Sequence, residues 1–183
     1  MTDDSPDIVP TASRIAYENR WMRVREDAVR RRDGSAGIYG VIEKNDFVLV
    51  VPVHEDGALE LVQQYRYPVA ERLWEFPMGM WGPAGTDPLL VAQHELAEET
   101  GLVAATLRHV GTLHQAPGTM RQSAHIVLAH GLTRGPARLE VEEQDLISRR
   151  IPRAEFERMV RDDEIRDAIS VAAWGLLLMK GLV

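Results

Sequence analysis

The chain has 183 residues, a formal net charge of −7 and no cysteine, and its composition is typical of one soluble globular domain that needs no disulfide or structural metal to fold. The absence of cysteine excludes thiol nucleophiles and cysteine-ligated zinc, and it favours a reducing compartment, so we expect a cytoplasmic protein. The negative charge argues against a nucleic-acid partner, and the longest apolar run, 171–179, is too short to span a membrane.

The N-terminal quarter of the chain predicts a frayed end followed by strands. Residues 1–12 are polar and interrupted by proline, which is typical of a disordered terminus. From Trp21 to Glu26 the residues alternate with the period of two expected of a half-buried strand. We therefore expect a single domain over 13–183, in which 13–45 forms an antiparallel strand segment.

A central strand follows over 47–53, where almost every residue is apolar. A continuous apolar run of this length indicates a strand that is covered on both faces. Shorter stretches of the same character, 59–67 and 73–76, continue the strand pattern.

The first helix is predicted over 88–100. Asp87 is a good N-cap, Pro88 suits the first helical position, and Gly101 suits the left-handed residue that ends a helix.

Two further strands, 108–113 and 124–129, and two terminal helices, one from residue 154 and one over 169–179, complete the pattern. This order predicts an α+β fold, with a mixed β-sheet sandwiched by helices.

The predicted helix carries three carboxylates on one face. Glu98 and Glu99 lie about −60° and +40° from Glu95 around the helix axis, so the three groups repel one another. Residues 73–107 contain no lysine or arginine, and a divalent cation with oxygen ligands is the simplest compensation. The alternative is a solvated, glutamate-rich helix surface.

The residues around this helix resemble the signature of the Nudix hydrolases, G-x5-E-x7-R-E-U-x-E-E-x-G-U, where U is aliphatic. The matching positions are Glu95, Leu96, Glu98, Glu99, Gly101 and Leu102. Three positions depart from the signature: the arginine is replaced by His94, the upstream glutamate by Thr86, and Gly79 lies one residue too far away. In the family the arginine and that glutamate brace the loop against the helix, and we expect His94 and Asp87 to replace part of this brace.

Shorter motifs extend the resemblance to the ADP-ribose pyrophosphatase branch of the family. They are Gln64–Pro68, Leu73–Pro77, Ala116–Gly118 and Glu164–Ala168. The resemblance implies the Nudix fold and metal-dependent hydrolysis of the diphosphate bond of a nucleoside diphosphate linked to a sugar or similar group. It also implies a small-molecule nucleotide substrate and a homodimer that is built through the N-terminal strands.

The resemblance further implies roles for individual residues. Mg²⁺ or Mn²⁺ would be bound by Glu95, Glu98 and Glu99, which are also the expected catalytic residues, and a loop carbonyl near Met78 or Gly79 would complete the shell. The expected substrate-binding residues are Arg66, Glu75 and Gln122. Arg66 can bind two phosphate oxygens in one plane, although a surface arginine at a strand end is an equally good reading. Glu75 can instead simply pair with an arginine.

The general base is not fixed by the sequence. Gln122 occupies the position of the glutamate that activates water in the ADP-ribose enzymes, and an amide cannot accept that proton. Because 100–139 contains no acidic residue, the open candidates are Glu98, which we favour, a histidine of this segment, and the acidic residues Glu142, Glu143 and Asp145. The same departure leaves a second function open, that of a Nudix-fold ligand-binding protein with weak or lost hydrolysis.

Overall fold

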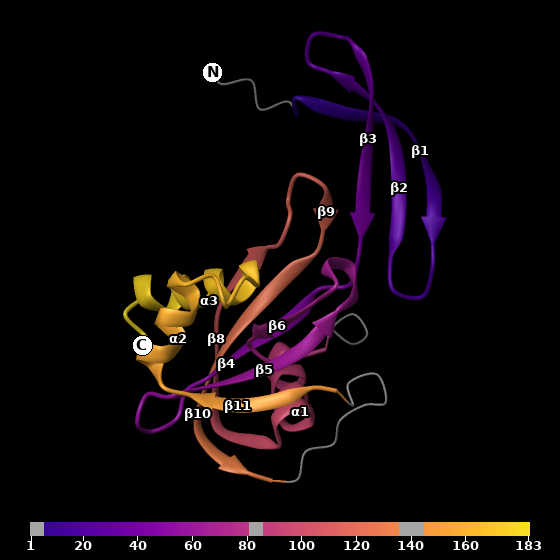
Figure 1. Ribbon diagram of the computed structural model, residues 1–183. Helices are drawn as coiled ribbons and strands as arrows, with labels where there is room; N and C mark the ends of the chain where they lie inside the picture. The colour runs from indigo at the N-terminus through magenta and orange to yellow at the C-terminus, as the bar shows by residue number, and fades with distance from the viewer. Residues whose placement is uncertain (1–5, 81–85, 136–144) are drawn as a thin grey trace. The chain divides into compact units, whose positions relative to one another are not determined.

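The computed structural model describes residues 6–80, 86–135 and 145–183. The chain divides into two compact units, and we describe each by itself. The N-terminal unit is Met1–Asn45 with His114–Ser123, and the core unit is Asp46–Leu113 with Ala124–Val183. Figure 1 labels their elements.

The N-terminal unit is a sheet with the strand order β1-β2-β3-β9. Its strands are β1 (Ile8–Glu18), β2 (Arg23–Arg31), β3 (Ala36–Glu43) and β9 (Met120–Arg121). The first three pair antiparallel, and β9 lies parallel to β3. The strands expected over 13–45 are present.

The start of β1 differs from the sequence prediction of a frayed segment over 1–12. Ile8 already pairs with Arg31 of β2, so residues 8–12 belong to a strand. Pairing with a neighbouring strand satisfies backbone groups that a polar, proline-containing segment would otherwise leave in water. Residues 1–5 lie outside the described residues.

The core unit contains two sheets. One has the order β7-β4-β10-β8 and is mixed, because β4 pairs parallel with β10 and antiparallel with β7. Its strands are β4 (Phe47–Pro52), β7 (Met78–Met80), β8 (Leu102–His114) and β10 (Ser123–Arg134). The other sheet is antiparallel, with the order β11-β5-β6, and consists of β5 (Leu59–Arg66), β6 (Glu71–Glu75) and β11 (Ile147–Ile151).

The central strand β4 is buried along its whole length, as its apolar run predicted. Leu49 and Val51 pack into the larger core, which contains residues of α2 and α3, whereas Val48 and Val50 pack into a second core with residues of α1. Alternate side chains of a strand point to opposite faces, so the two cores lie on opposite faces of this sheet. Helices therefore cover both faces of a mixed sheet, and the predicted α+β architecture is confirmed.

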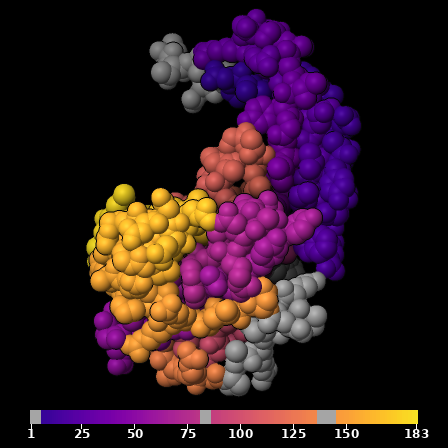
Figure 2. All heavy atoms as spheres, viewed as in Figure 1, coloured from indigo at the N-terminus to yellow at the C-terminus, as the bar shows by residue number. Residues whose placement is uncertain are grey.

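Within residues 6–80, 86–135 and 145–183, three α-helices and one short 3₁₀-helix accompany the sheets. They are η1 (Tyr67–Val69), α1 (Pro88–Thr100), α2 (Arg153–Arg161) and α3 (Ala168–Met179). The C-terminal helices rest against the β5–β6 region: Ser170 Oγ accepts a hydrogen bond of 3.0 Å from Phe76 N, and Arg166 forms an ion pair with Glu71. Figure 2 shows these helices, in orange and yellow, beside the magenta β5–β6 segment.

Strands β8 and β10 extend well beyond the expected 108–113 and 124–129. The extra residues are mostly exposed and have no strong alternation of apolar and polar side chains. Their strand conformation follows from pairing with neighbouring strands, which the sequence pattern does not indicate. None of the helices in the described part of the chain combines the length and the apolar character that crossing a membrane requires.

Candidate active site

The helix that carries the three predicted carboxylates begins and ends where the local sequence indicated. Asp87 is the N-cap and its side chain accepts a hydrogen bond of 2.9 Å from Leu89 N. Gly101 ends the helix with a left-handed φ of 70°, and its N–H donates to Ala97 O. Buried Leu96 fixes the rotation of the helix against the sheet, so that Glu95 and Glu99 face β7.

His94, Glu95 and Glu98 form a cluster of possible metal ligands on this helix, and their ligand atoms all lie within 4.8 Å of one another. His94 Nδ1 is 3.1 Å from Glu98 Oε2. The His94 side chain is 72% exposed and that of Glu98 is 12% exposed, so the cluster opens to solvent on one side.

Strand β7 approaches the helix so closely that a side chain at residue 79 would displace the Glu95 carboxylate. A Cβ on Gly79 would lie 1.9 Å from the carboxyl carbon of Glu95 and 2.1 Å from one of its oxygens. One residue earlier, Met78 N–H donates a hydrogen bond of 3.1 Å to Oε2 of the buried Glu99. Two of the three carboxylates therefore lie directly against the backbone of β7.

This donor set fits a divalent cation. Hard cations such as Mg²⁺ and Mn²⁺ prefer carboxylate and carbonyl oxygens, and Glu95 and Glu98 offer carboxylate oxygens close to one another. The backbone of residue 79, close to which a carbonyl ligand is predicted, lies against the Glu95 carboxylate.

Asp87 and His94 do not act together as the expected brace. Asp87 caps the helix at Leu89, and His94 contacts Glu98 four residues further along. Both contacts are local to the helix, because short side chains at its first turn and exposed face reach their own backbone or the next turn first.

Arg66 and Glu75 are brought together at the ends of β5 and β6. Arg66 Nη2 lies 2.7 Å from Glu75 Oε1, and its Nε donates to Glu75 Oε2 at 3.2 Å. Burial raises the pKa of Glu75 to about 7, while the charge of Arg66 acts in the opposite direction. The simple pairing of Glu75 with an arginine, left open by the sequence, is what the structure shows.

Gln122 belongs to the N-terminal unit. It is buried, and its Nε2 donates a hydrogen bond of 2.7 Å to the carbonyl oxygen of Asn45. This contact joins two segments of that unit that are far apart in the sequence.

The other candidate bases have separate surroundings. Asp145 pairs with Arg72 at 2.7 Å, and His109 and His125 lie side by side on β8 and β10 with ring centroids 5.5 Å apart. Glu142 and Glu143 lie outside the described residues.

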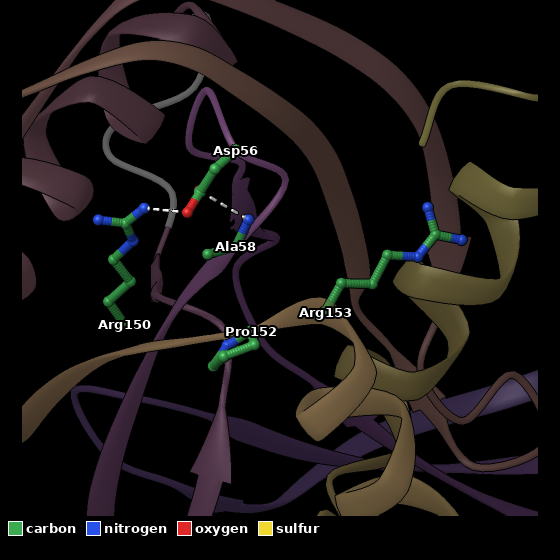
Figure 3. A pocket seen from close by; sticks show the side chains of 5 residues that line it. All are labelled: Asp56, Ala58, Arg150, Pro152 and Arg153. Carbon is green, nitrogen blue, oxygen red and sulfur yellow. Dashed lines mark hydrogen bonds and ion pairs between the residues drawn. The ribbon is translucent and has the colours of Figure 1, made fainter.

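A hollow of about 340 Å³ lies between the β4–β5 turn and the start of α2 (Figure 3). Its lining contains none of the predicted site residues, and its two arginines already face carboxylates: Arg150 pairs with Asp56, and Arg153 pairs with Glu157. We therefore do not assign the phosphate site to this hollow.

Comparison with known protein families identifies the class of this protein. The NUDIX domain family matches residues 44–170, and the chain belongs to this family. Residues 10–42 match a second family, described as the nucleoside diphosphate sugar hydrolase N-terminal domain.

Individual relatives are similar over most of the chain. An ADP-ribose pyrophosphatase of Mycobacterium tuberculosis is 34% identical over 167 residues, which cover 91% of this chain and 81% of the relative. An ADP-ribose pyrophosphatase of Bacillus subtilis is 26% identical over 149 residues, covering 81% of this chain and 80% of the relative. A crystal structure of an ADP compounds hydrolase has the same fold, with a TM-score of 0.85 and 24% identity over 97% of this chain and 98% of that one.

Sequence reasoning missed two features of this site. It treated His94 as part of a brace, although its spacing of four residues from Glu98 places both on one helix face. It also missed how closely β7 approaches Glu95 at Gly79, a contact that nothing in the sequence indicates.

Proposed function

We propose that this protein is a metal-dependent Nudix pyrophosphohydrolase that cleaves the diphosphate bond of a nucleoside diphosphate linked to a sugar or similar group. The observation that carries this proposal is the acidic cluster on α1, set against the β7 backbone in a chain of the NUDIX family. Two relatives named ADP-ribose pyrophosphatases and the match of residues 10–42 make ADP-ribose the first substrate to test.

In this proposal Glu95, Glu98 and Glu99 hold Mg²⁺ or Mn²⁺. Such an ion, when bound, neutralises phosphate charge and lowers the pKa of a bound water. The backbone of β7 supports the site, since Met78 N–H orients Glu99 and Gly79 makes room for Glu95.

Glu98 is the proposed proton acceptor. The oxygen of the attacking water bonds to one phosphorus, the bond from that phosphorus to the bridging oxygen breaks, and the proton of the water passes to the Glu98 carboxylate. Its place in the cluster with His94 and Glu95, which opens to solvent on one side, supports this role, because a general base must lie within reach of the attacking water.

Substrate contacts are proposed for Arg66 and Glu75 of the core unit. Arg66 is 36% exposed, and a guanidinium has five N–H donors, so the pair with Glu75 leaves donors for a phosphate. Glu75 then orients Arg66 from its buried side.

We also propose a homodimer that is built through the N-terminal strands. Every residue of β1 is exposed, and the apolar side chains Ile15, Tyr17 and Trp21 are each about half exposed. An exposed edge strand with apolar side chains is typical of a surface that another chain covers. Light scattering at micromolar concentration should give twice the mass of one chain, and cell fractionation should recover the protein in the cytoplasm.

The experiment for the activity is turnover of ADP-ribose, ADP-glucose, GDP-mannose, NADH and FAD with Mg²⁺ or Mn²⁺, followed by phosphatase-coupled detection of the monoester products. We expect the protein to hydrolyse one class of these substrates with a kcat in the usual range of about 1–10³ s⁻¹. Glu98→Gln should lower kcat by at least about 100-fold, whereas Glu55→Gln, at an exposed residue of the β4–β5 turn, should leave it unchanged.

Equal loss in both variants, or turnover that persists in Glu98→Gln, would contradict the proposed role of Glu98. Metal binding without turnover of any member would instead favour a Nudix-fold ligand-binding protein. The substitution of the family's base by the buried Gln122 is the observation that keeps this second function open.

A further inference from the structure

His94 is the residue of the acidic cluster that sets this chain apart from its family signature. The signature has arginine at this position, and arginine cannot bind a metal because it has no lone pair to donate while it is protonated. The imidazole of histidine can. In this protein the possible ligand atoms of His94, Glu95 and Glu98 all lie within 4.8 Å of one another.

The geometry of this cluster suits one small cation. An octahedral ion with bonds of about 2.1 Å holds adjacent ligand atoms about 3.0 Å apart and opposite ligand atoms about 4.2 Å apart. His94 Nδ1 and Glu98 Oε2 are 3.1 Å apart, which is the separation of two adjacent ligands. They lie one helical turn apart on the same face of α1, so the helix makes the two side chains neighbours.

We propose that His94 is a nitrogen ligand of the metal ion that the proposed function requires, and that it biases the site toward Mn²⁺, Co²⁺ or Zn²⁺ over Mg²⁺. This inference rests on the proposed function. Imidazole binds later divalent metals well, whereas Mg²⁺ demands oxygen ligands and gives up its water reluctantly. The exposed side of His94 leaves its ring accessible to an ion from solution, and the less exposed Glu98 supplies the charge.

The test compares the wild type with two matched substitutions. His94→Asn places an amide near the position of Nδ1 without a change of formal charge, so it replaces a nitrogen ligand by an oxygen ligand. His130→Asn makes the same change at an exposed histidine of β10, outside the cluster, and controls for adventitious binding by surface histidines.

Two readouts are independent of turnover. Pulsed EPR of bound Mn²⁺ should show coupling to an imidazole nitrogen in the wild type and in His130→Asn, and none in His94→Asn. Calorimetric titrations should show that His94→Asn lowers the ratio of Co²⁺ to Mg²⁺ affinity by at least about tenfold, while His130→Asn leaves the ratio unchanged.

The possible failures are distinct. If Mn²⁺ binds the wild type without imidazole coupling, or if the coupling persists in His94→Asn, His94 is not a ligand. The proposed hydrolysis is then unaffected, provided that the substrate panel is turned over. Wild-type protein that binds no Mn²⁺ overturns this inference together with the metal site of the proposed function.

Discussion

Replacing Gly79 by alanine should separate metal binding from folding. The new Cβ would lie 1.9 Å from the Glu95 carboxyl carbon, and ordinary contact between carbon atoms is about 3.5–4.0 Å. The carboxylate must therefore move by about 1.6 Å or more. Metal–ligand distances tolerate about 0.2 Å, so Glu95 would no longer reach an ion in its original place.

The effect on stability should be small, because the atoms that would clash belong to the end of a flexible side chain. We expect Gly79→Ala to lower the free energy of unfolding by about 0.5–1.5 kcal/mol, the cost of an unfavourable rotamer. Metal affinity should fall by at least about tenfold. Urea unfolding of the metal-free protein measures the first quantity, and calorimetric titration with Mn²⁺ measures the second.

Gly175→Ala is the matched control. It makes the same chemical change within α3, where a Cβ meets no atom within 4 Å. This variant should be more stable by about 0.5–1 kcal/mol, because glycine weakens a helix, and its Mn²⁺ affinity should equal that of the wild type. Wild-type Mn²⁺ affinity in Gly79→Ala would refute the placement of Glu95 in the metal site.

Three other changes test the fold and the buried charge. The pKa of Glu75 is raised from its ordinary value of 4.5 to about 7, so the contribution of its protonated form to stability is full below pH 4.5 and is lost as the pH rises through about 7. In urea titrations across this window, the wild type should lose about 3 kcal/mol of unfolding free energy relative to Glu75→Gln. A difference between the two proteins that stays constant with pH would contradict the shift. Phe156→Ala should lower the free energy of unfolding by about 3–5 kcal/mol in the same assay, because this ring is fully buried between Phe76 and Trp174. A decrease below about 1 kcal/mol would mean that the core is packed differently. Asp87→Ala removes the N-cap of α1 and should cost about 1 kcal/mol, whereas an unchanged thermal midpoint would show that the cap hydrogen bond contributes little.

The elements that could be predicted from the amino-acid sequence are those whose signals are local. Helix α1 runs over the predicted 88–100, because an N-cap, a first-turn proline and a left-handed glycine act within one turn of the helix end. Strand β4 was predictable for a similar reason, since a continuous apolar run has to be buried on both faces. The positions of Glu95, Glu98 and Glu99 on one helix face follow from the helix period alone.

Which groups from different elements meet depends on tertiary packing. The pairing of Arg66 with Glu75 depends on the register of β5 against β6, and the start of β1 at Ile8 depends on its pairing with β2. The close approach of β7 to α1, which sets Gly79 against the Glu95 carboxylate, depends on how the helix packs on the sheet. Such contacts join residues that are distant in the sequence, and no local preference of the chain encodes their distance.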